Sequence, residues 1–198
     1  MSLEETLRSE LARLNLSLSN QVQEKLLQYV RELEHWNKSV NLTALSDASL
    51  IERLIVEPVW IGQELQLSGV LADIGSGNGC PAIPLVITRG FHRAHLVEAR
   101  TKRAAFLRHV ASKIGLKEIE VHRSRLEDLA EPIENVDWIT LQAVNPTPQL
   151  LSSLGRVSSA TTRVVWITST ADAPISSAKK ISVPGSNTRA WIFGLDQF

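Results

Sequence analysis

Apolar residues recur at helical spacing through the first 60 residues of the chain. One stripe of leucines is spaced by three or four residues, and a second stripe follows Ser19 as far as Trp36. Serine commonly caps helix N-termini, so the second helix is predicted to begin after Ser19. Two such helices cannot form a complete core, and we predict that residues 1–60 are a helical extension packed on a domain of residues 61–198. The first stripe is Leu3, Leu7, Leu11 and Leu14.

From about residue 70 the pattern changes to short apolar runs that alternate with helical stripes. This alternation is typical of parallel strands joined by crossover helices. One crossover helix is predicted from Ala104 to Ile114 and is closed by Gly115. The last two runs flank turn residues and predict an antiparallel hairpin at the sheet edge. The fold class is therefore α/β, with strands predicted at 70–74, 95–98, 119–122, 136–141, 163–168, 180–183 and 190–193.

Composition limits the classes of protein that the chain can represent. Its 198 residues are 43% hydrophobic, which is enough for one substantial core. Cys80 is the single cysteine, which excludes an intramolecular disulfide framework and suits a reducing cytoplasm. The chain has no secretory signal pattern and no apolar run of about 20 residues, the length that spans a bilayer. We therefore expect a cytoplasmic protein with no membrane partner.

The charge of the chain balances overall but not locally. Lys and Arg together number 21, as do Asp and Glu. A basic segment nevertheless lies at 100–125, where eight basic residues stand against two acidic ones. This surplus favours contact with nucleic acid phosphates, and a solvated helix face explains it equally well. The eight basic residues are Arg100, Lys102, Arg103, Arg108, Lys113, Lys117, Arg123 and Arg125.

A glycine-rich turn follows the first predicted strand. Asp73 lies near the end of that strand, and glycine then occupies alternate positions as Gly75, Gly77 and Gly79. Glycine adopts positive φ angles and has no Cβ, so a turn of this kind can approach a ligand closely. Ligands bind at the carboxyl ends of strands in parallel α/β sheets. The turn is therefore the first candidate for a binding site.

The residues around the turn discriminate between ligands. A dinucleotide site has the pattern G-x-G-x-x-G, or alanine last, and here Cys80 takes the last position. The carboxylate of Asp73 suits a cationic ligand better than a pyrophosphate. Glu98 follows Gly79 by 19 residues, a spacing at which acidic side chains bind ribose hydroxyls. S-adenosylmethionine, a nucleoside with a sulfonium and an ammonium group, meets these conditions. An NAD-type dinucleotide and a purely structural turn stay as alternatives.

Four segments carry a resemblance to one family: 36–44 (WNKSVNLTA), 73–85 (DIGSGNGCPAIPL), 97–107 (VEARTKRAAFL) and 124–127 (SRLE). Their order and spacing resemble the bacterial methyltransferases of 16S ribosomal RNA that modify guanine N7, also called glucose-inhibited division protein B. The resemblance covers nearly the whole chain. It implies a Rossmann-like class I S-adenosylmethionine-dependent methyltransferase fold with a mostly parallel seven-stranded sheet. It also implies ribosomal RNA or the small ribosomal subunit as partner of a monomeric enzyme.

The resemblance further implies roles for particular residues. Those that would hold the donor are Asp73, Gly75, Gly77 and Gly79 at its methionine part, Glu98 at its ribose, Leu126 and Glu127 at its adenine, with Cys80 and Gln142 in the same pocket. Those that would meet the RNA are Asn37, Asn41, Thr43, Arg100, Lys102 and Arg103. Asn and Thr also cap helices and build turns, which is the alternative for the first three.

No catalytic residue is assigned from the sequence. Guanine N7 presents a lone pair, so methyl transfer to it needs no general base. The five histidines are interpreted as scattered surface or strand-end residues, and no metal is expected. They are His35, His92, His95, His109 and His122.

Three positions depart from the family pattern. Leu54 replaces the histidine of an R-H-x-x-D-S segment that keeps its acidic charge at Glu57, and Gln142 replaces the arginine of an S-R-A segment. The late K-G pair of the family falls near Thr168 in this chain, which removes another cation. Glutamine can hydrogen-bond but cannot make a charged bidentate contact. Two further hypotheses therefore stay open: a degenerate, non-catalytic RNA- or ribosome-binding protein, and a methyltransferase with another acceptor. An NAD-dependent oxidoreductase is the remaining alternative.

Overall fold

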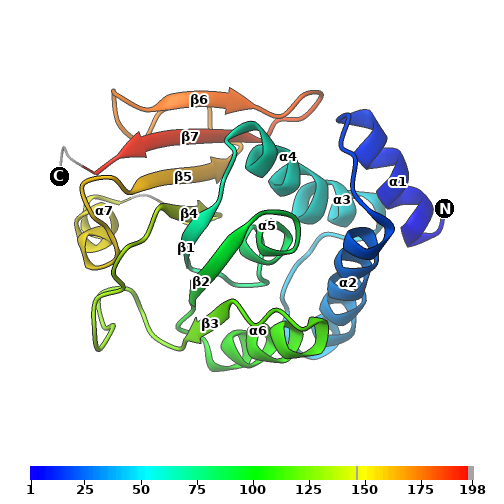
Figure 1. Ribbon diagram of the computed structural model, residues 1–198, viewed down its shortest axis with the longest axis horizontal. Helices are drawn as coiled ribbons and strands as arrows, with labels where there is room; N and C mark the ends of the chain where they lie inside the picture. The colour runs from blue at the N-terminus through cyan, green and yellow to red at the C-terminus, as the bar shows by residue number, and fades with distance from the viewer. Residues whose placement is uncertain (146, 196–198) are drawn as a thin grey trace.

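A seven-stranded sheet forms the centre of the computed structural model, which describes residues 1–145 and 147–195 (Figure 1). The strand order is β3-β2-β1-β4-β5-β7-β6. Strands β1 to β5 run parallel, whereas β7 lies antiparallel between β5 and β6. The predicted parallel sheet and C-terminal hairpin are confirmed. The strands are β1 (Gly69–Ile74), β2 (Phe91–Val97), β3 (Ile119–His122), β4 (Trp138–Gln142), β5 (Arg163–Thr168), β6 (Lys179–Ser182) and β7 (Arg189–Gly194).

Helices cover one face of the sheet in a thick layer, visible to the right of the strands in Figure 1. The predicted caps form as expected: the Ser19 hydroxyl accepts from the Val22 N–H, and Gly115 ends α6 in a left-handed conformation. A π-helical turn, η1, joins two α-helices. The elements are α1 (Leu3–Arg13), α2 (Asn20–Val40), α3 (Asp47–Ile51), η1 (Glu52–Val56), α4 (Glu57–Glu64), α5 (Ala82–Thr88) and α6 (Thr101–Ile114).

The N-terminal helices share one hydrophobic core with the sheet. Leu26 of α2 and Leu71 of β1 are both fully buried and belong to the same apolar cluster, together with Phe106 of α6. The predicted division at residue 60 falls inside α4, which spans Glu57–Glu64. The division into two units stays a prediction. The helices of residues 1–60 pack on the sheet and complete the hydrophobic core that both parts share.

The opposite face of the sheet has a thinner cover. It consists of α7 (Pro148–Ser153), the 3-10 turn η2 (Leu154–Val157) and an irregular segment between β3 and β4. Residues 123–137 of that segment contain no helix. Their buried apolar residues, such as Leu129 and Ile133, pack under the sheet and leave the ends of β2 and β3 less covered.

The acidic residue of the divergent R-H-x-x-D-S segment has a structural role. The Glu57 side chain is 2% exposed and accepts hydrogen bonds from Ser186 and, at 2.6 Å, from Thr188. Both hydroxyls belong to the turn between β6 and β7. Glu57 therefore ties the helical layer to the C-terminal hairpin. None of the helices described here is long and apolar enough for a membrane span.

We predict that Phe106→Ala destabilises the protein by about 3–5 kcal/mol, because the ring is fully buried against α2 and the site cannot collapse. Urea unfolding followed by circular dichroism measures the free energy of unfolding. Lys113→Ala on the exposed face of the same helix is the control and should change it by less than about 0.5 kcal/mol. Similar values for the two variants would contradict the assigned core.

Candidate functional site

A cavity of about 560 Å³ opens at the carboxyl ends of β1, β2 and β4. Its walls come from the 75–80 turn, residues 98–103, residues 142–144 and residues 42–54. Eight of the predicted site residues line it: Thr43, Gly75, Gly77, Cys80, Glu98, Arg100, Arg103 and Gln142. The position agrees with the rule that parallel α/β sheets bind ligands at this edge.

The glycine turn is shaped by backbone hydrogen bonds to the neighbouring strand. Gly75 has a φ of 77°, and its N–H donates to the Val97 carbonyl at 2.9 Å. The Ser76 N–H donates to the same carbonyl at 3.2 Å. Gly79 has a φ of 92°, and a Cβ there would lie 2.4 Å from Ile83, so glycine is required for packing as well as for conformation.

Glu98 closes the turn. Its carboxylate accepts the Gly77 N–H at 2.9 Å and the Arg100 N–H at 2.7 Å, one on each oxygen. The side chain is 6% exposed yet borders the cavity. A carboxylate oxygen can accept more than one hydrogen bond, so Glu98 retains acceptor capacity toward a hydroxyl-bearing ligand.

The N–H groups of the turn are occupied inside the protein. Those of Gly75, Ser76 and Gly77 bond to Val97 and Glu98, and that of Gly79 donates to the Ser76 carbonyl at 2.6 Å. A phosphate-binding turn instead directs such groups at the ligand. The arrangement is therefore suited to a nucleoside held by Glu98 and not to the pyrophosphate of a dinucleotide.

Asp73 lies beneath the turn and outside the cavity lining. It is 1% exposed, and its Oδ1 accepts from the Thr140 hydroxyl at 2.6 Å, while its Oδ2 is buried without a hydrogen bond. Burial raises the pKa of Asp73 to about 7, the Thr140 and Ser76 hydrogen bonds oppose this, and the charge of Glu98 adds to it. An uncompensated acidic oxygen below the cavity is compatible with a cationic ligand above it.

Cys80 and Gln142 form a pair on the cavity wall. The Cys80 thiol donates to the Gln142 side-chain oxygen at 3.1 Å. Burial raises the pKa of Cys80 well above its usual range, and the nearby Asp73 charge adds to this, so the thiol stays protonated. The pair thus provides packing and one hydrogen bond where the family pattern has arginine.

The wall opposite the turn comes from the end of α2 and the segment after it. Asn37 accepts the N–H groups of Leu42 and Thr43 and donates to the Thr43 carbonyl, all within 2.9 Å. These bonds fold the chain so that Leu42 and Thr43 border the cavity. Tyr29, which the motifs did not single out, donates to the Asn78 carbonyl at 2.8 Å and fixes α2 to the turn.

Other predicted residues lie outside the cavity. Leu126 is buried in the core under the sheet, Glu127 and Lys102 are exposed, and Asn41 is an exposed residue whose carbonyl accepts from Arg103 at 3.5 Å. Of the three departures from the family pattern, Leu54 and Gln142 border the cavity and Thr168 does not. Arg53 joins Arg100 and Arg103 as a third arginine on the wall.

The strand order and the glycine turn after β1 together define the class I S-adenosylmethionine-dependent methyltransferase fold. A solved precorrin-6y C5,15-methyltransferase from Geobacter metallireducens shares it with a TM-score of 0.51 at 16% identity, over 71% of this chain and 89% of that chain.

Sequence comparison narrows the class. Ribosomal RNA small subunit methyltransferase G of Neisseria meningitidis serogroup C is 31% identical over 158 residues, which cover 79% of this chain and 75% of that protein. The protein of the same name from Polynucleobacter asymbioticus is 40% identical over 123 residues, 59% of this chain and 55% of that protein. The family model of GidB, rRNA small subunit methyltransferase G, matches residues 22–180. The chain therefore belongs to this family.

We predict that Asp73→Asn changes how stability depends on pH. The pKa of Asp73 is raised from 3.8 to about 7, so the folded chain holds a proton that the unfolded chain releases, and wild-type stability falls as pH rises through this window. The variant lacks this loss, which amounts to about 1.4 kcal/mol per pH unit. Urea unfolding at about pH 5 and about pH 8 measures the free energy of unfolding of both chains. The value for the variant relative to that of the wild type should be higher at about pH 8 than at about pH 5.

The exposed Asp172→Asn is the control for this comparison and should follow the wild type at both pH values. An equal stability difference between Asp73→Asn and wild type at both pH values would show that Asp73 titrates in its ordinary range.

Proposed function

We propose that the chain transfers a methyl group from S-adenosylmethionine to N7 of a guanine in 16S ribosomal RNA of the small subunit. The proposal that the chain binds this methyl donor rests on one observation. The glycine turn is hydrogen-bonded to the Glu98 carboxylate beside a cavity of about 560 Å³. The proposal that guanine in ribosomal RNA is the acceptor is supported by family membership and by the names of the relatives. Pockets for small ligands commonly have volumes of about 300–1,000 Å³, so the cavity has a suitable size.

The donor supplies an electrophilic methyl group on a sulfonium. Glu98 would bind its ribose hydroxyls, because the carboxylate is already oriented by two backbone N–H groups. Gly75 and Gly77 would lie against its methionine part. Asp73 is buried below them with its pKa raised to about 7, and a cation bound in the cavity would favour its ionised form. Leu126 and Glu127 are proposed for the adenine from their motif, although they do not line the cavity in this structure.

The acceptor chemistry needs little from side chains. Guanine N7 already presents a lone pair, so placing it in line with the methyl group is the main requirement. Within the described part of the chain, the cavity lining contains no histidine, and its single carboxylate, Glu98, is engaged by backbone N–H groups. We therefore assign no general base.

Basic side chains surround the proposed entrance for RNA. Arg53, Arg100 and Arg103 line the cavity, and Lys102 is exposed next to them at the start of α6. Phosphate contacts of this kind orient a nucleic acid without reading its sequence. We propose that these residues hold the RNA backbone while Thr43 and Gln142 border the entering base.

We predict that S-adenosylhomocysteine binds the wild-type chain with a micromolar Kd in calorimetry. Glu98→Ala should weaken binding by about 10-fold to 100-fold, because it removes a charged acceptor for the ribose. The exposed Glu118→Ala is the control and should bind like the wild type. A second assay supplies S-adenosylmethionine with a tritiated methyl group and small ribosomal subunits from cells that lack the endogenous activity. The wild-type chain should label these subunits, and the label should be found in 7-methylguanine.

Each alternative has its own outcome in these assays. Binding of NAD without S-adenosylhomocysteine would indicate an oxidoreductase, and donor binding with unlabelled subunits would indicate another acceptor. RNA binding without donor binding or methyl transfer would support the non-catalytic hypothesis. In that case the replacement of the family's arginine by Gln142 would be the first candidate cause of the lost activity.

We predict that replacing Arg100 and Arg103 together by glutamine weakens binding to a 16S ribosomal RNA fragment. Each lost phosphate contact should lower the slope of log affinity against log salt by about 0.7–0.9. Filter binding at several salt concentrations measures that slope. Lys113→Gln, at the far end of α6, is the control, and an unchanged slope in the double variant would identify these arginines as a solvated helix face.

A further inference from the structure

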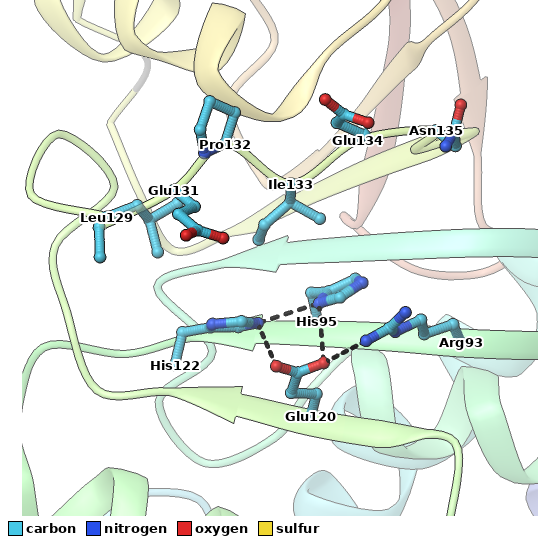
Figure 2. A pocket seen from close by; sticks show the side chains of 11 residues that line it. Arg93, His95, Glu120, His122, Leu129, Glu131, Pro132, Ile133, Glu134 and Asn135 are labelled. Atoms are coloured by element: carbon cyan, nitrogen blue, oxygen red, sulfur yellow. Dashed lines mark hydrogen bonds and ion pairs between the residues drawn. The ribbon is translucent and has the colours of Figure 1, made fainter.

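Two histidines and a glutamate lie together on the thinly covered face of the sheet (Figure 2). None of them lines the donor cavity, the cavity of about 560 Å³ beside the glycine turn and Glu98. His95 lies on β2, and Glu120 and His122 lie on β3. The register places His95 opposite Glu120 and Val97 opposite His122 in parallel strands, so the three side chains share one face. Of the five histidines expected to be scattered surface or strand-end residues, His95 and His122 are instead neighbours.

The distances between the potential ligand atoms are short. His95 Nδ1 lies 2.9 Å from His122 Nε2 and 3.7 Å from a carboxylate oxygen of Glu120, whose other oxygen is 3.8 Å from His122 Nε2. Zinc binds imidazole nitrogen at about 2.0–2.1 Å, which in a tetrahedral site places neighbouring ligand atoms about 3.3 Å apart. The three observed separations lie on either side of this value, and small side-chain rotations would equalise them.

A metal ion would replace the hydrogen bond between the two imidazoles. His95 Nδ1 and His122 Nε2 share that bond at 2.9 Å, so one of the two nitrogens carries its proton. Metal binding therefore requires this proton to move to the other nitrogen of its ring or to leave the site.

A large cavity provides access to the cluster. It has a volume of about 840 Å³ and lies between the cluster and residues 129–135 of the irregular segment before β4. Figure 2 shows Glu131 and Ile133 on the wall that faces His122 and His95. Water or a further ligand can thus reach the ion from the cavity side, as in sites with three protein ligands.

Arg93 completes the surroundings of the cluster. Its guanidinium donates to Glu120 at 2.8 Å. This contact holds the Glu120 carboxylate near the histidines, in the way that residues behind metal ligands orient them.

We propose that His95, Glu120 and His122 bind a divalent transition-metal ion of the zinc class, with one coordination position open to the cavity. Two imidazoles and one carboxylate are the ligand set of several three-ligand zinc sites. Magnesium and calcium prefer ligand sets made of oxygen, so they fit this cluster poorly. In residues 1–145 and 147–195, this is the one group of three or more such side chains whose ligand atoms lie within 4.8 Å of one another.

The site would fasten two strand ends that also lead to the donor cavity. The His122 carbonyl accepts the Glu98 N–H at 3.0 Å, directly after β2. A metal ion between His95 and His122 adds a second connection across the same pair of strands. The metal would therefore stabilise the folded chain by its binding, whatever the acceptor of the methyl group is.

The test uses the 198-residue chain freed of metal with a chelator. Calorimetry with Zn²⁺ at about pH 7 should show one saturable site, and Co²⁺ should give the visible absorption of a tetrahedral ligand field. His122→Gln should weaken Zn²⁺ binding at least about 100-fold and Glu120→Gln at least about tenfold. His92→Gln and Glu118→Gln, two exposed neighbours outside the cluster, are matched controls and should bind like the wild type.

Thermal melting separates loss of the site from loss of the fold. With chelator present, the Glu120→Gln and wild-type chains should melt alike, and Zn²⁺ should raise the Tm of the wild type and both controls but not of His122→Gln. No saturable Zn²⁺ binding by the wild type, or equal binding by wild type and His122→Gln, would overturn the proposal. Mg²⁺ competing with Zn²⁺ at equal concentration would overturn it too.

Discussion

The carboxylate of Glu98 is the interaction on which the candidate site depends. It accepts backbone N–H groups from Gly77 in the turn after β1 and from Arg100 at the start of α6. Hydrogen bonds to an ionised acceptor are stronger than neutral ones, so the turn and the helix start are held in a fixed relation. The side chain proposed to bind the donor ribose also builds the loop around it, and the pocket therefore exists before a ligand arrives.

The N-terminal helices belong to this arrangement as closely as the sheet does. Tyr29 bonds to the Asn78 carbonyl, Asn37 folds the segment that ends at Thr43, and η1 brings Arg53 to the same wall. An extension that packs only for stability would not need polar bonds to the glycine turn. Its contacts instead make the helical layer one side of the cavity, which connects its packing energy with the shape of the site.

Much of the fold was predictable because its signals are local. Ser19, Gly115 and the alternating apolar runs determine helix ends and strands from a few neighbouring residues. Helix α7 was missed because its segment is short and polar, and the role of Glu57 was missed because its partners lie 129 and 131 residues away. The same limit applies to the site: motifs located Glu98 and the glycines, whereas the pairing of His95 with His122 depends on strand register, which no local pattern encodes.

The placement of β7 between β5 and β6 has a consequence for association between molecules. It makes β6 the outer strand at one of the two edges of the sheet, and an outer strand offers unpaired N–H and C=O groups to any other strand. This strand is only four residues long, and Lys179 and Lys180 are both exposed on it. A short, positively charged edge is a poor template for strand addition, so the C-terminal hairpin protects this edge of the sheet from edge-to-edge pairing.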